Sequence, residues 1–246
     1  MKNNVESFKQ SIDVWNIHLP DHHQDTALCR TLLNSEELER AAKFLKPADA
    51  ESFILCRGLL RRILADYLGA EPSSLRFNRN AQGKPFLEDG GLEFNVSHSR
   101  DRLLIAVTAG RAVGVDIEFR RKGLNMAAIA KRWFAPDEQT FFQGLEKPEE
   151  GFFEIWAKKE AYVKALGIGI YKELNTFAVP LGGKPFFPTL GPERSERGSA
   201  AYAVGQRPKG EATDGQWFFQ TLEIDSDYAA AVVSEAPPVP VNLRIF

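Results

Sequence analysis

Two acidic motifs, one with the periodicity of a strand and one with that of a helix, constrain this chain more than any other feature. Residues 114–118 read Gly-Val-Asp-Ile-Glu, and residues 156–167 read Trp-Ala-Lys-Lys-Glu-Ala-Tyr-Val-Lys-Ala-Leu-Gly. Side chains two apart on a strand share a face, so Asp116 and Glu118 point one way while their neighbours can pack on a core. The alternative interpretation is a half-exposed edge strand whose acids are simply solvated.

The helical motif adds a third carboxylate to these two. Trp156, Glu160 and Lys164 fall on one stripe of a helix, at spacings of four. An exposed Glu–Lys pair would also have this spacing, but tryptophan is usually largely buried, so we expect the stripe to line a cleft. Mg²⁺ takes one or two carboxylates together with phosphate oxygens, and Lys159 and Lys164 would balance the phosphate charge. The set therefore predicts a metal-bound diphosphate site.

Composition narrows the class of protein around this site. The chain has 246 residues, 43% of them hydrophobic, which is enough for one large domain or two small ones. The net charge of −2 argues against a nucleic-acid partner. Cys29 and Cys56 form no disulfide framework or metal-ligand spacing, as in a reducing compartment. Residues 1–10 lack the apolar run of a signal peptide and no stretch is apolar enough to span a membrane, so we expect a cytoplasmic protein without membrane contact.

The apolar periodicity predicts a mixture of helices and short strands. Helices are expected over 36–44, with Ser35 as N-cap, and over 48–68, 126–133, 137–145 and 151–166, with Gly69 and Gly167 ending the second and the last. Strands are expected over 14–19, 75–77, 85–87, 92–96, 102–108, 112–118, 201–204, 217–224 and 228–234. The strands 102–108 and 112–118 read as a hairpin turning at Gly110, residues 190–198 as a loop, and residues from 237 onward as an extension.

Both halves of the chain carry helices and strands, which allows an α+β fold of two similar lobes. We expect an N-terminal lobe of residues 1–111 and a C-terminal lobe of residues 112–246 that carries most of the metal site. No linker composition marks this boundary.

Four motifs in order resemble a known family. Besides the two acidic motifs, residues 83–85 read Gly-Lys-Pro and residues 95–99 read Asn-Val-Ser-His-Ser. Together, over residues 83–167, they closely resemble the Sfp-type, pseudodimeric class of 4′-phosphopantetheinyl transferases. The resemblance implies two α+β lobes related by a pseudo-twofold axis in a monomer. It also implies Mg²⁺-dependent transfer of phosphopantetheine from coenzyme A to a serine of an apo acyl or peptidyl carrier protein, releasing adenosine 3′,5′-bisphosphate.

The resemblance also implies roles for individual residues. The expected metal ligands are Asp116, Glu118 and Glu160; the expected catalytic residues are Glu160, Lys164 and Asp116; and the expected coenzyme A contacts are Arg40, Arg79, Lys84, Ser97, His98, Lys159 and Lys164. Glu160, or a metal-bound water, would deprotonate the carrier serine, because a hydroxyl is a poor nucleophile at neutral pH. Lys164 would contact the diphosphate and stabilise charge on the leaving group.

Two other functions fit the same residues. A non-catalytic coenzyme A or nucleotide-binding module would bind the ligand without transferring it, and a Mg²⁺-dependent diphosphate hydrolase would transfer it to water. Residues 120–122, Arg-Arg-Lys, form either a solvated basic turn or a patch that steers an acidic carrier protein.

Overall fold

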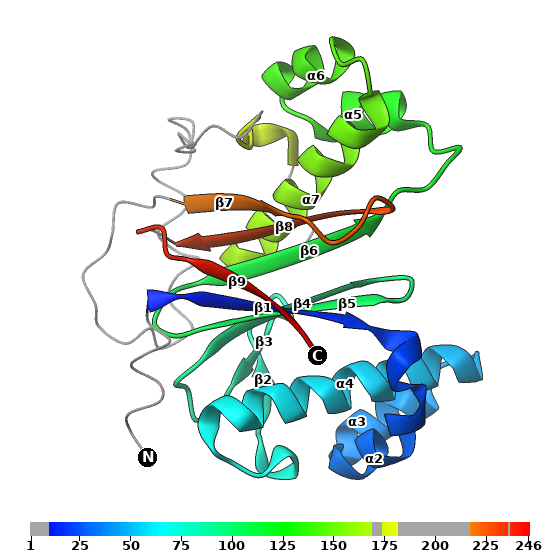
Figure 1. Cartoon of the computed structure of the whole chain (residues 1–246), viewed down its shortest axis with the longest axis vertical. Coiled ribbons are helices and arrows are strands. Elements are labelled where there is room, and N and C mark those ends of the chain that lie inside the picture. The colour runs from blue at the N-terminus through cyan, green and yellow to red at the C-terminus, as the bar shows by residue number, and fades with distance from the viewer. Residues whose placement is uncertain (1–9, 169–173, 182–216, 236) are drawn as a thin grey trace.

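The computed structural model describes residues 10–168, 174–181, 217–235 and 237–246. The predicted strand 201–204 and the predicted loop 190–198 lie outside these residues. Within the described part, two β-sheets stack on each other and helices cover their outer faces (Figure 1). The predicted α+β class is confirmed.

The first sheet has the strand order β4-β5-β1-β9. Its strands are β1 (Ile12–His18), β4 (Glu93–Ser99), β5 (Arg102–Thr108) and β9 (Val241–Ile245). A separate ribbon is formed by β2 (Phe77–Arg79) and β3 (Pro85–Leu87). On the outer side lie the helices α2 (Thr26–Leu32), α3 (Ser35–Ala42) and α4 (Pro47–Leu68), with 3-10 helices η2 (Leu19–Asp25) and η3 (Pro72–Ser74) (Figure 1).

The second sheet has the order β6-β8-β7. Its strands are β6 (Val113–Phe119), β8 (Tyr228–Glu235) and β7 (Trp217–Leu222). Helix α7 (Pro148–Leu166) lies against the outer face of this sheet, and α5 (Met126–Trp133), α6 (Pro136–Gln143) and the 3-10 helix η4 (Leu174–Thr176) lie beyond it (Figure 1).

An apolar core between the two sheets fixes which way β6 faces. Val14 and Leu104 from the first sheet pack there with Val115, Ile117 and Val232 from the second, and all five side chains are almost fully buried. Because side chains alternate along a strand, the even-numbered residues of β6 face α7 instead. The predicted separation of an apolar face from a carboxylate face is therefore confirmed.

Helix ends follow the local sequence closely. Gly69 and Gly167 end α4 and α7 in the left-handed region, with φ of 60° and 66°, as the sequence predicts. The N-cap of α3 is Asn34 rather than Ser35. Its side chain accepts from Glu37 N at 2.9 Å, while Glu37 accepts from Asn34 N at 3.0 Å, which makes a reciprocal capping box.

The predicted hairpin between 102–108 and 112–118 is wrong. β5 pairs with β4 along one edge and with β1 along the other, so it has no edge left for β6. β6 pairs with β8, whose residues lie more than a hundred positions later. Residues 109–112, with Gly110 at φ 71°, therefore carry the chain from the first sheet to the second.

Strand β9 comes from the predicted C-terminal lobe of residues 112–246 but belongs to the first sheet. β9 runs parallel to β1 as the outer strand of the first sheet. The buried Asp13 of β1 accepts from Asn242 Nδ2 at 2.8 Å and from Arg244 Nε at 2.8 Å, which fixes β9 in place. The first sheet thus combines strands from both ends of the described chain, and the pseudo-twofold relation of the lobes stays a prediction.

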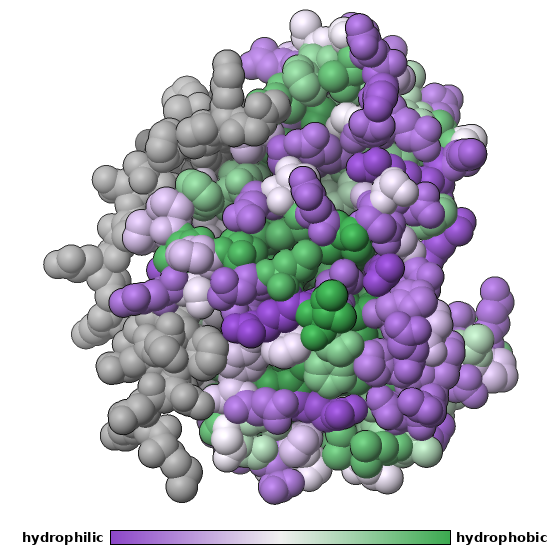
Figure 2. Space-filling model, viewed as in Figure 1, coloured by the Kyte–Doolittle hydropathy of each residue, from purple (hydrophilic) through white to green (hydrophobic). Residues whose placement is uncertain are grey.

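The surface of β9 is unusually apolar. Leu243 and Ile245 are 43% and 85% exposed, and Figure 2 shows hydrophobic residues gathered over the strands at mid-height of this face. Among those residues, no helix is both long and apolar enough to cross a lipid bilayer.

Glycine at position 114 lets α7 lie directly on β6. A Cβ atom on Gly114 would lie 2.0 Å from the carbonyl oxygen of Ala161 and 2.4 Å from the amide nitrogen of Ala165. The small side chains of α7 at these two positions allow the same approach from the helix side. Because Asp116 shares this face of β6, the contact brings the acidic motif of the strand against that of the helix.

We predict that Gly114→Ala destabilises the protein by about 3 kcal/mol, at the upper end of overpacking costs, since helix backbone cannot move aside as a side chain can. Gly144→Ala is the matched control, because a Cβ there meets nothing closer than 3.6 Å. Its stability should change by less than about 1 kcal/mol. Urea unfolding measures both variants, and equal stabilities would contradict the close packing of α7 on β6.

Candidate active site

The first sheet contacts β6 through side chains rather than through a backbone ladder. β6 is an edge strand, and its pairing with β8 leaves every second N–H pointing away from the sheet. Asn95 Oδ1 accepts from Val115 N at 2.9 Å, Ser97 Oγ accepts from Ile117 N at 3.3 Å, and Ser99 Oγ accepts from Phe119 N at 3.0 Å. We call Asn95, Ser97 and Ser99 the seam.

Ser97 also joins the strand motif to the helix motif. Its Oγ lies 2.8 Å from Asp116 Oδ1 and 2.8 Å from Lys164 Nζ, and Lys164 Nζ lies 2.6 Å from the same carboxylate oxygen. A hydroxyl donates once and accepts twice. Ser97 therefore donates to Asp116 and accepts from Lys164 and from Ile117 N, which uses its full capacity.

Asp116 is the most deeply placed of the three acids. It is 3% exposed, and its Oδ2 is buried without a hydrogen-bond partner among the described residues. A buried carboxylate oxygen without a donor is costly, because it has lost water and gained nothing in return. A bound cation would satisfy this atom.

Glu160 faces the same region from α7, and its pKa is strongly shifted. Burial, followed by the negative charge of Asp116, raises its pKa to about 7, and Lys164 only partly opposes this. Burial and Asp116 also raise the pKa of Glu118. These effects show that the three carboxylates share one poorly solvated region, in which Lys164, and Arg121 at Glu118, act in the opposite direction.

Trp156 has a role at this site that the sequence did not reveal. It is half-buried and stacks on Phe152, with ring centroids 6.1 Å apart and an interplanar angle of 12°. A hydrogen bond from Trp156 lowers the pKa of Glu118 against the stronger effect of burial. Trp156 of α7 therefore interacts with Glu118 of β6. From the sequence we had expected it only to be a buried ring beside Glu160 and Lys164.

Lys84, which directly precedes β3, connects this strand to the first residue of β6 and to the last turn of α7. Its Nζ donates to Val113 O at 3.1 Å and to Ala165 O at 3.2 Å, and burial lowers its pKa. The neighbouring Asn80 donates to Gly167 O at 2.9 Å. Lysine has three N–H donors, so two of those on Lys84 hold β6 against the end of α7.

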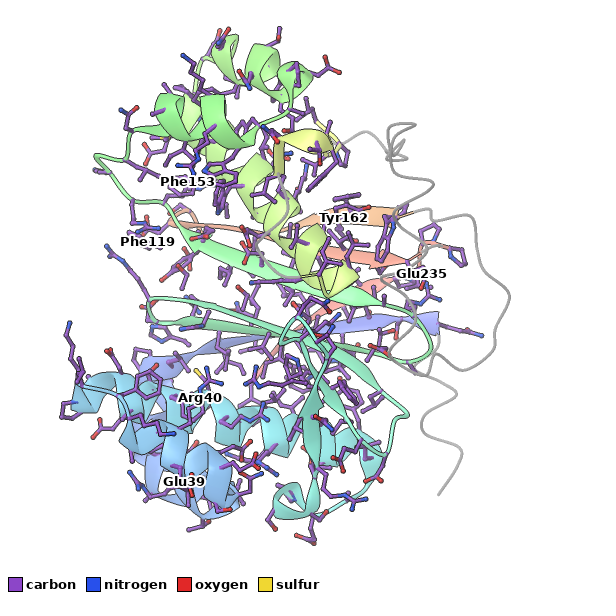
Figure 3. The ribbon with its side chains drawn as sticks, turned by 180° about the vertical axis from the view of Figure 1, so that it is seen from behind. Glu39, Arg40, Phe119, Phe153, Tyr162 and Glu235 are labelled. Carbon is purple, nitrogen blue, oxygen red and sulfur yellow. The ribbon has the colours of Figure 1, made fainter. Side chains whose placement is uncertain are left out.

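Three further predicted coenzyme A contacts come from β4, β2 and α3. His98 is exposed on β4, and desolvation together with the charge of Lys164 lowers its pKa. Arg79 is exposed and donates to Gly83 O at 2.8 Å. Arg40 lies on α3, 5.2 Å from the centre of the Phe53 ring, and Figure 3 shows it among the helices of the N-terminal half. The structure does not bring Arg40 to the acidic motifs.

Lys159 is a correction to the predicted site. Its side chain is fully buried, and its Nζ lies 2.7 Å from Glu138 Oε2 and donates to Leu174 O at 2.7 Å and to Phe177 O at 2.6 Å. All three N–H donors are thereby used inside the protein. Lys158 is also buried, with Glu154 and Pro180 O as partners. Neither lysine reaches the acids, because both face the core of the C-terminal half.

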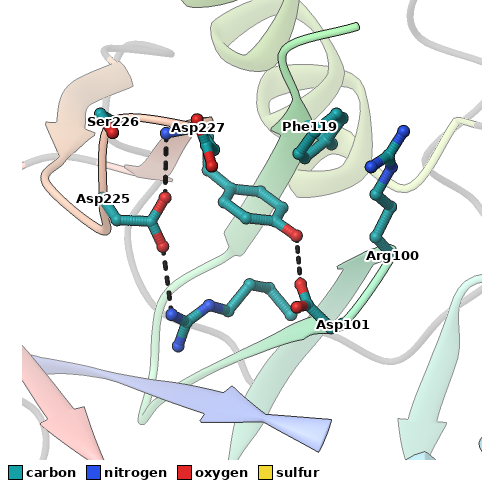
Figure 4. A pocket seen from close by; sticks show the side chains of 8 residues that line it. Arg100, Asp101, Phe119, Asp225, Ser226 and Asp227 are labelled. Carbon is teal, nitrogen blue, oxygen red and sulfur yellow. Dashed lines mark hydrogen bonds and ion pairs between the residues drawn. The ribbon is translucent and has the colours of Figure 1, made fainter. Parts of the chain in front are cut away.

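A cavity of about 390 Å³ lies at the far end of β6, and none of the predicted site residues lines it. In Figure 4 the Arg100 side chain lies beside the Phe119 ring, 3.5 Å from its centre, while Tyr228 donates to Asp101. Arg102 donates to Asp225 at 3.1 Å in the same cavity. These contacts join the β4–β5 turn to the β7–β8 turn, so this cavity marks where the two sheets are held together.

The basic segment 120–122 divides into two parts. Arg120 is held by the β7–β8 turn, since its backbone N donates to Asp227 O at 2.8 Å and its Nη1 donates to Ser226 O at 3.2 Å. Arg121 and Lys122 are exposed. Only these two are available to a partner protein.

The side chains at this site are of the type that binds a divalent cation. Carboxylate oxygens are the ligands that Mg²⁺ prefers, and Asp116 Oδ2 is an unsatisfied one. Across the described ranges, no three His, Cys, Asp or Glu side chains are already grouped closely enough to hold an ion. Lys164 pairs with Asp116 Oδ1 instead, so a cation would enter beside this ammonium group or displace it.

Comparison with known proteins places both halves of the chain in one family. The model of the 4′-phosphopantetheinyl transferase superfamily matches residues 112–233, and the model of the 4′-phosphopantetheinyl transferase N-terminal region matches residues 18–110. The 4′-phosphopantetheinyl transferase HetI of Nostoc sp. is 38% identical over 175 residues, covering 69% of this chain and 74% of HetI.

More remote similarities extend over most of the chain. The 4′-phosphopantetheinyl transferase Sfp of Bacillus subtilis is 26% identical over 218 residues, covering 87% of this chain and 88% of Sfp. The solved structure of holo-acyl-carrier-protein synthase from Neisseria meningitidis overlaps 51% of this chain and 98% of its own, at 22% identity and a TM-score of 0.36.

Fold and site together define an α+β protein in which Lys164 of α7 pairs with Asp116 of an edge strand, and in which burial and the charge of Asp116 raise the pKa of Glu118 and Glu160. The chain belongs to the 4′-phosphopantetheinyl transferase superfamily, and the protein is a transferase. The resemblance inferred from the four sequence motifs is confirmed.

We predict that Glu160→Gln stabilises the metal-free protein at alkaline pH. The folded-state pKa of about 7 lies above the ordinary value of 4.5, so wild-type stability falls as pH rises between these values and stays reduced above them. The advantage of the variant should grow by about 2 kcal/mol between pH 5 and pH 8, at about 1.4 kcal/mol per pKa unit. Denaturant unfolding in a chelator measures this difference, and a pH-independent gap would contradict the raised pKa.

Proposed function

We propose that this protein transfers 4′-phosphopantetheine from coenzyme A to a serine of an apo acyl or peptidyl carrier protein, with Mg²⁺ and with release of adenosine 3′,5′-bisphosphate. The observation that carries the proposal is the convergence of Asp116, Glu160 and Lys164 beside Ser97. Such a site combines ligands for a hard cation, a proton acceptor and a fixed positive charge. Phosphoryl-type transfer needs these three elements and little covalent help from the protein.

Asp116, Glu118 and Glu160 would hold the Mg²⁺ ion. When bound, the ion supplies charge neutralisation at the diphosphate. Asp116 has the strongest claim among the three, because its Oδ2 is buried and lacks a partner among the described residues. Glu118 would contribute from the same face of β6 as Asp116.

Glu160 would accept the proton of the carrier serine. The serine oxygen forms a bond to the β-phosphorus of coenzyme A while the bond from that phosphorus to the bridging oxygen breaks, and the nucleotide leaves with that oxygen. A carboxylate whose pKa is about 7 without metal is well matched to proton transfer near neutral pH. A nearby cation favours its ionised form, which is the form that accepts a proton.

Lys164 would balance charge on the leaving diphosphate. Its Nζ donates to Asp116 Oδ1 and Ser97 Oγ, which leaves the third of its N–H donors for a phosphate oxygen. Lys84 likewise has one donor beyond the two that hold Val113 O and Ala165 O. His98 would approach the same end of coenzyme A from β4.

The nucleotide end of coenzyme A would extend over the N-terminal half. Arg79, which is exposed, would meet its phosphates there, and Arg40 would do so only at the far end of the ligand. Ser97 has no spare hydrogen-bonding capacity, so it would contact coenzyme A only after giving up Asp116, Lys164 or Ile117 N.

We further propose a cytoplasmic monomer without a nucleic-acid or membrane partner. Both cysteines are free, which suits a reducing compartment. The exposed Arg121 and Lys122, beside the acidic strand, would attract an acidic carrier protein.

The mass of an apo carrier protein tests the proposed transfer. With the enzyme, coenzyme A and Mg²⁺, the carrier should gain the mass of phosphopantetheine, and Glu160→Gln should lower the rate at least about a hundredfold, the lower end of general-base contributions. Lys147→Gln, which removes an exposed charge paired only with Glu150, serves as the control for a remote charge. Release of phosphopantetheine without any carrier would indicate a hydrolase, and ligand binding without mass gain across several carriers would indicate a binding module.

Metal affinity should depend on pH through Glu160. Protons and Mg²⁺ compete for this carboxylate, whose pKa in the metal-free protein is about 7. The apparent affinity for Mg²⁺ should therefore fall about tenfold per pH unit below about pH 7, and Glu160→Gln should bind more weakly with a flatter dependence. Titration calorimetry between pH 5.5 and pH 8 measures both, and identical slopes would exclude Glu160 as a ligand.

A further inference from the structure

The seam satisfies backbone groups that would otherwise be buried without partners. Val115 and Ile117 are almost fully buried, and their N–H groups point away from β8 toward β4. A buried N–H without an acceptor costs free energy, so an edge strand in this position needs acceptors from another element. Three side chains of β4 supply them.

The register of the seam is regular. Asn95, Ser97 and Ser99 each bond to the N–H found 20 positions later in the chain. Alternate side chains on β4 thus meet alternate N–H groups on β6, as the two-residue period of both strands requires. A slip by one residue would turn Asp116 and Glu118 toward the apolar core, so the seam resists such a slip.

Only the middle member of the seam touches an acid. Ser97 bonds directly to Asp116 and Lys164, whereas the bonds of Asn95 and Ser99 end on the backbone of Val115 and Phe119. Those two backbone groups bracket the acids, one before Asp116 and one after Glu118. Asn95 and Ser99 therefore hold both ends of the acidic segment without belonging to its chemistry.

We propose that Asn95 and Ser99 are positioning residues for the acidic strand, which set where Asp116 and Glu118 stand relative to Glu160 and Lys164. The inference rests on the proposed metal-dependent function, because metal affinity reports the position of the acids. The remaining support for β6 comes from Lys84 at its first residue and from β8 along its other edge. β8 pairs with Glu118 and Phe119 along one edge of β6, and the seam holds the opposite edge of the same segment.

Matched variants of the full-length protein test this role. Ser99→Ala removes the acceptor of Phe119 N, and Ser99→Thr keeps a hydroxyl on a strand position that suits threonine. Asn95→Ala removes the acceptor of Val115 N at the other end. Thr108→Val is the control, because it removes a buried hydroxyl bond to Ser11 O, 2.9 Å long, in the same sheet but away from the seam.

Mn²⁺ binding without coenzyme A, followed by electron paramagnetic resonance, is the measurement, with a thermal melt of each variant beside it. Ser99→Ala and Asn95→Ala should each weaken Mn²⁺ binding by roughly tenfold, the size found for residues that orient metal ligands. Ser99→Thr should restore the wild-type affinity, and Thr108→Val should lower the melting temperature with no change in affinity. If Asn95→Ala does not fold, the half-buried Ser99 carries the test with its own two variants.

Each contrary outcome has a distinct meaning. Unchanged Mn²⁺ affinity in Ser99→Ala would overturn the positioning role while leaving the proposed function intact. An equal loss of affinity in Thr108→Val would also overturn it, because any buried bond in the sheet would then have the same effect. A wild-type protein that binds no Mn²⁺ would overturn the proposed metal site, and the positioning role with it.

Discussion

The outward-facing N–H groups of β6 are the constraint on which the rest of this molecule depends. β6 is buried on one face by the core between the sheets and on the other by α7, so its free edge cannot turn to solvent. Continuous backbone pairing with β4 would have merged the two sheets into one. The side chains of the seam accept hydrogen bonds from the outward N–H groups of β6, so the two sheets can remain separate and stacked. The core between the stacked sheets then determines which face of β6 is apolar. Because the odd-numbered side chains of β6 pack in that core, Asp116 and Glu118 face α7.

Two lysines in neighbouring turns of α7 have different roles. Lys159 and Lys164 are five residues apart, which places them about 140° apart around the helix axis. Lys159 is enclosed with Glu138 and two backbone carbonyls, and this pair ties α6 and the segment around Leu174 to the helix. Lys164 lies near the end of the helix, is partly exposed, and pairs with Asp116. The buried pair organises structure, whereas the accessible one stays available to a ligand.

The environment of the three acids lowers the stability of the folded protein but suits the binding of a cation. Burial raises the pKa of Glu118 and Glu160, and Asp116 keeps one oxygen without a donor among the described residues. The positive charges of Lys164 and, at Glu118, of Arg121 only partly offset the effects that raise these two pKa values. Gly114, which allows the close approach of α7, and the seam, which fixes β6, supply the rigid surroundings that hold these charges together. Functional sites are commonly strained in this way, with stability provided by their supports.

The sequence by itself determined the local features of this protein and the family to which it belongs. The helices over 48–68, 126–133 and 151–166 and the faces of β6 followed from periodicity, glycine caps and alternation, all of which act between neighbouring residues. The spacing of Glu160 and Lys164 placed both on one helix face. Lys159 lies about 100° from Glu160 and about 140° from Lys164 around the helix axis, although the motif had included it in the predicted site.

Only the tertiary structure decided the partners of each strand and the role of each polar side chain. β6 pairs with β8 rather than with β5, and β9 crosses to the first sheet, because pairing depends on which edges are free after the cores have formed. Asn95, Ser99 and Trp156 acquire their roles in the same way, from groups far away in the chain. Local patterns cannot report such contacts, since hydrogen bonding across lobes depends on distances in space that sequence spacing does not contain.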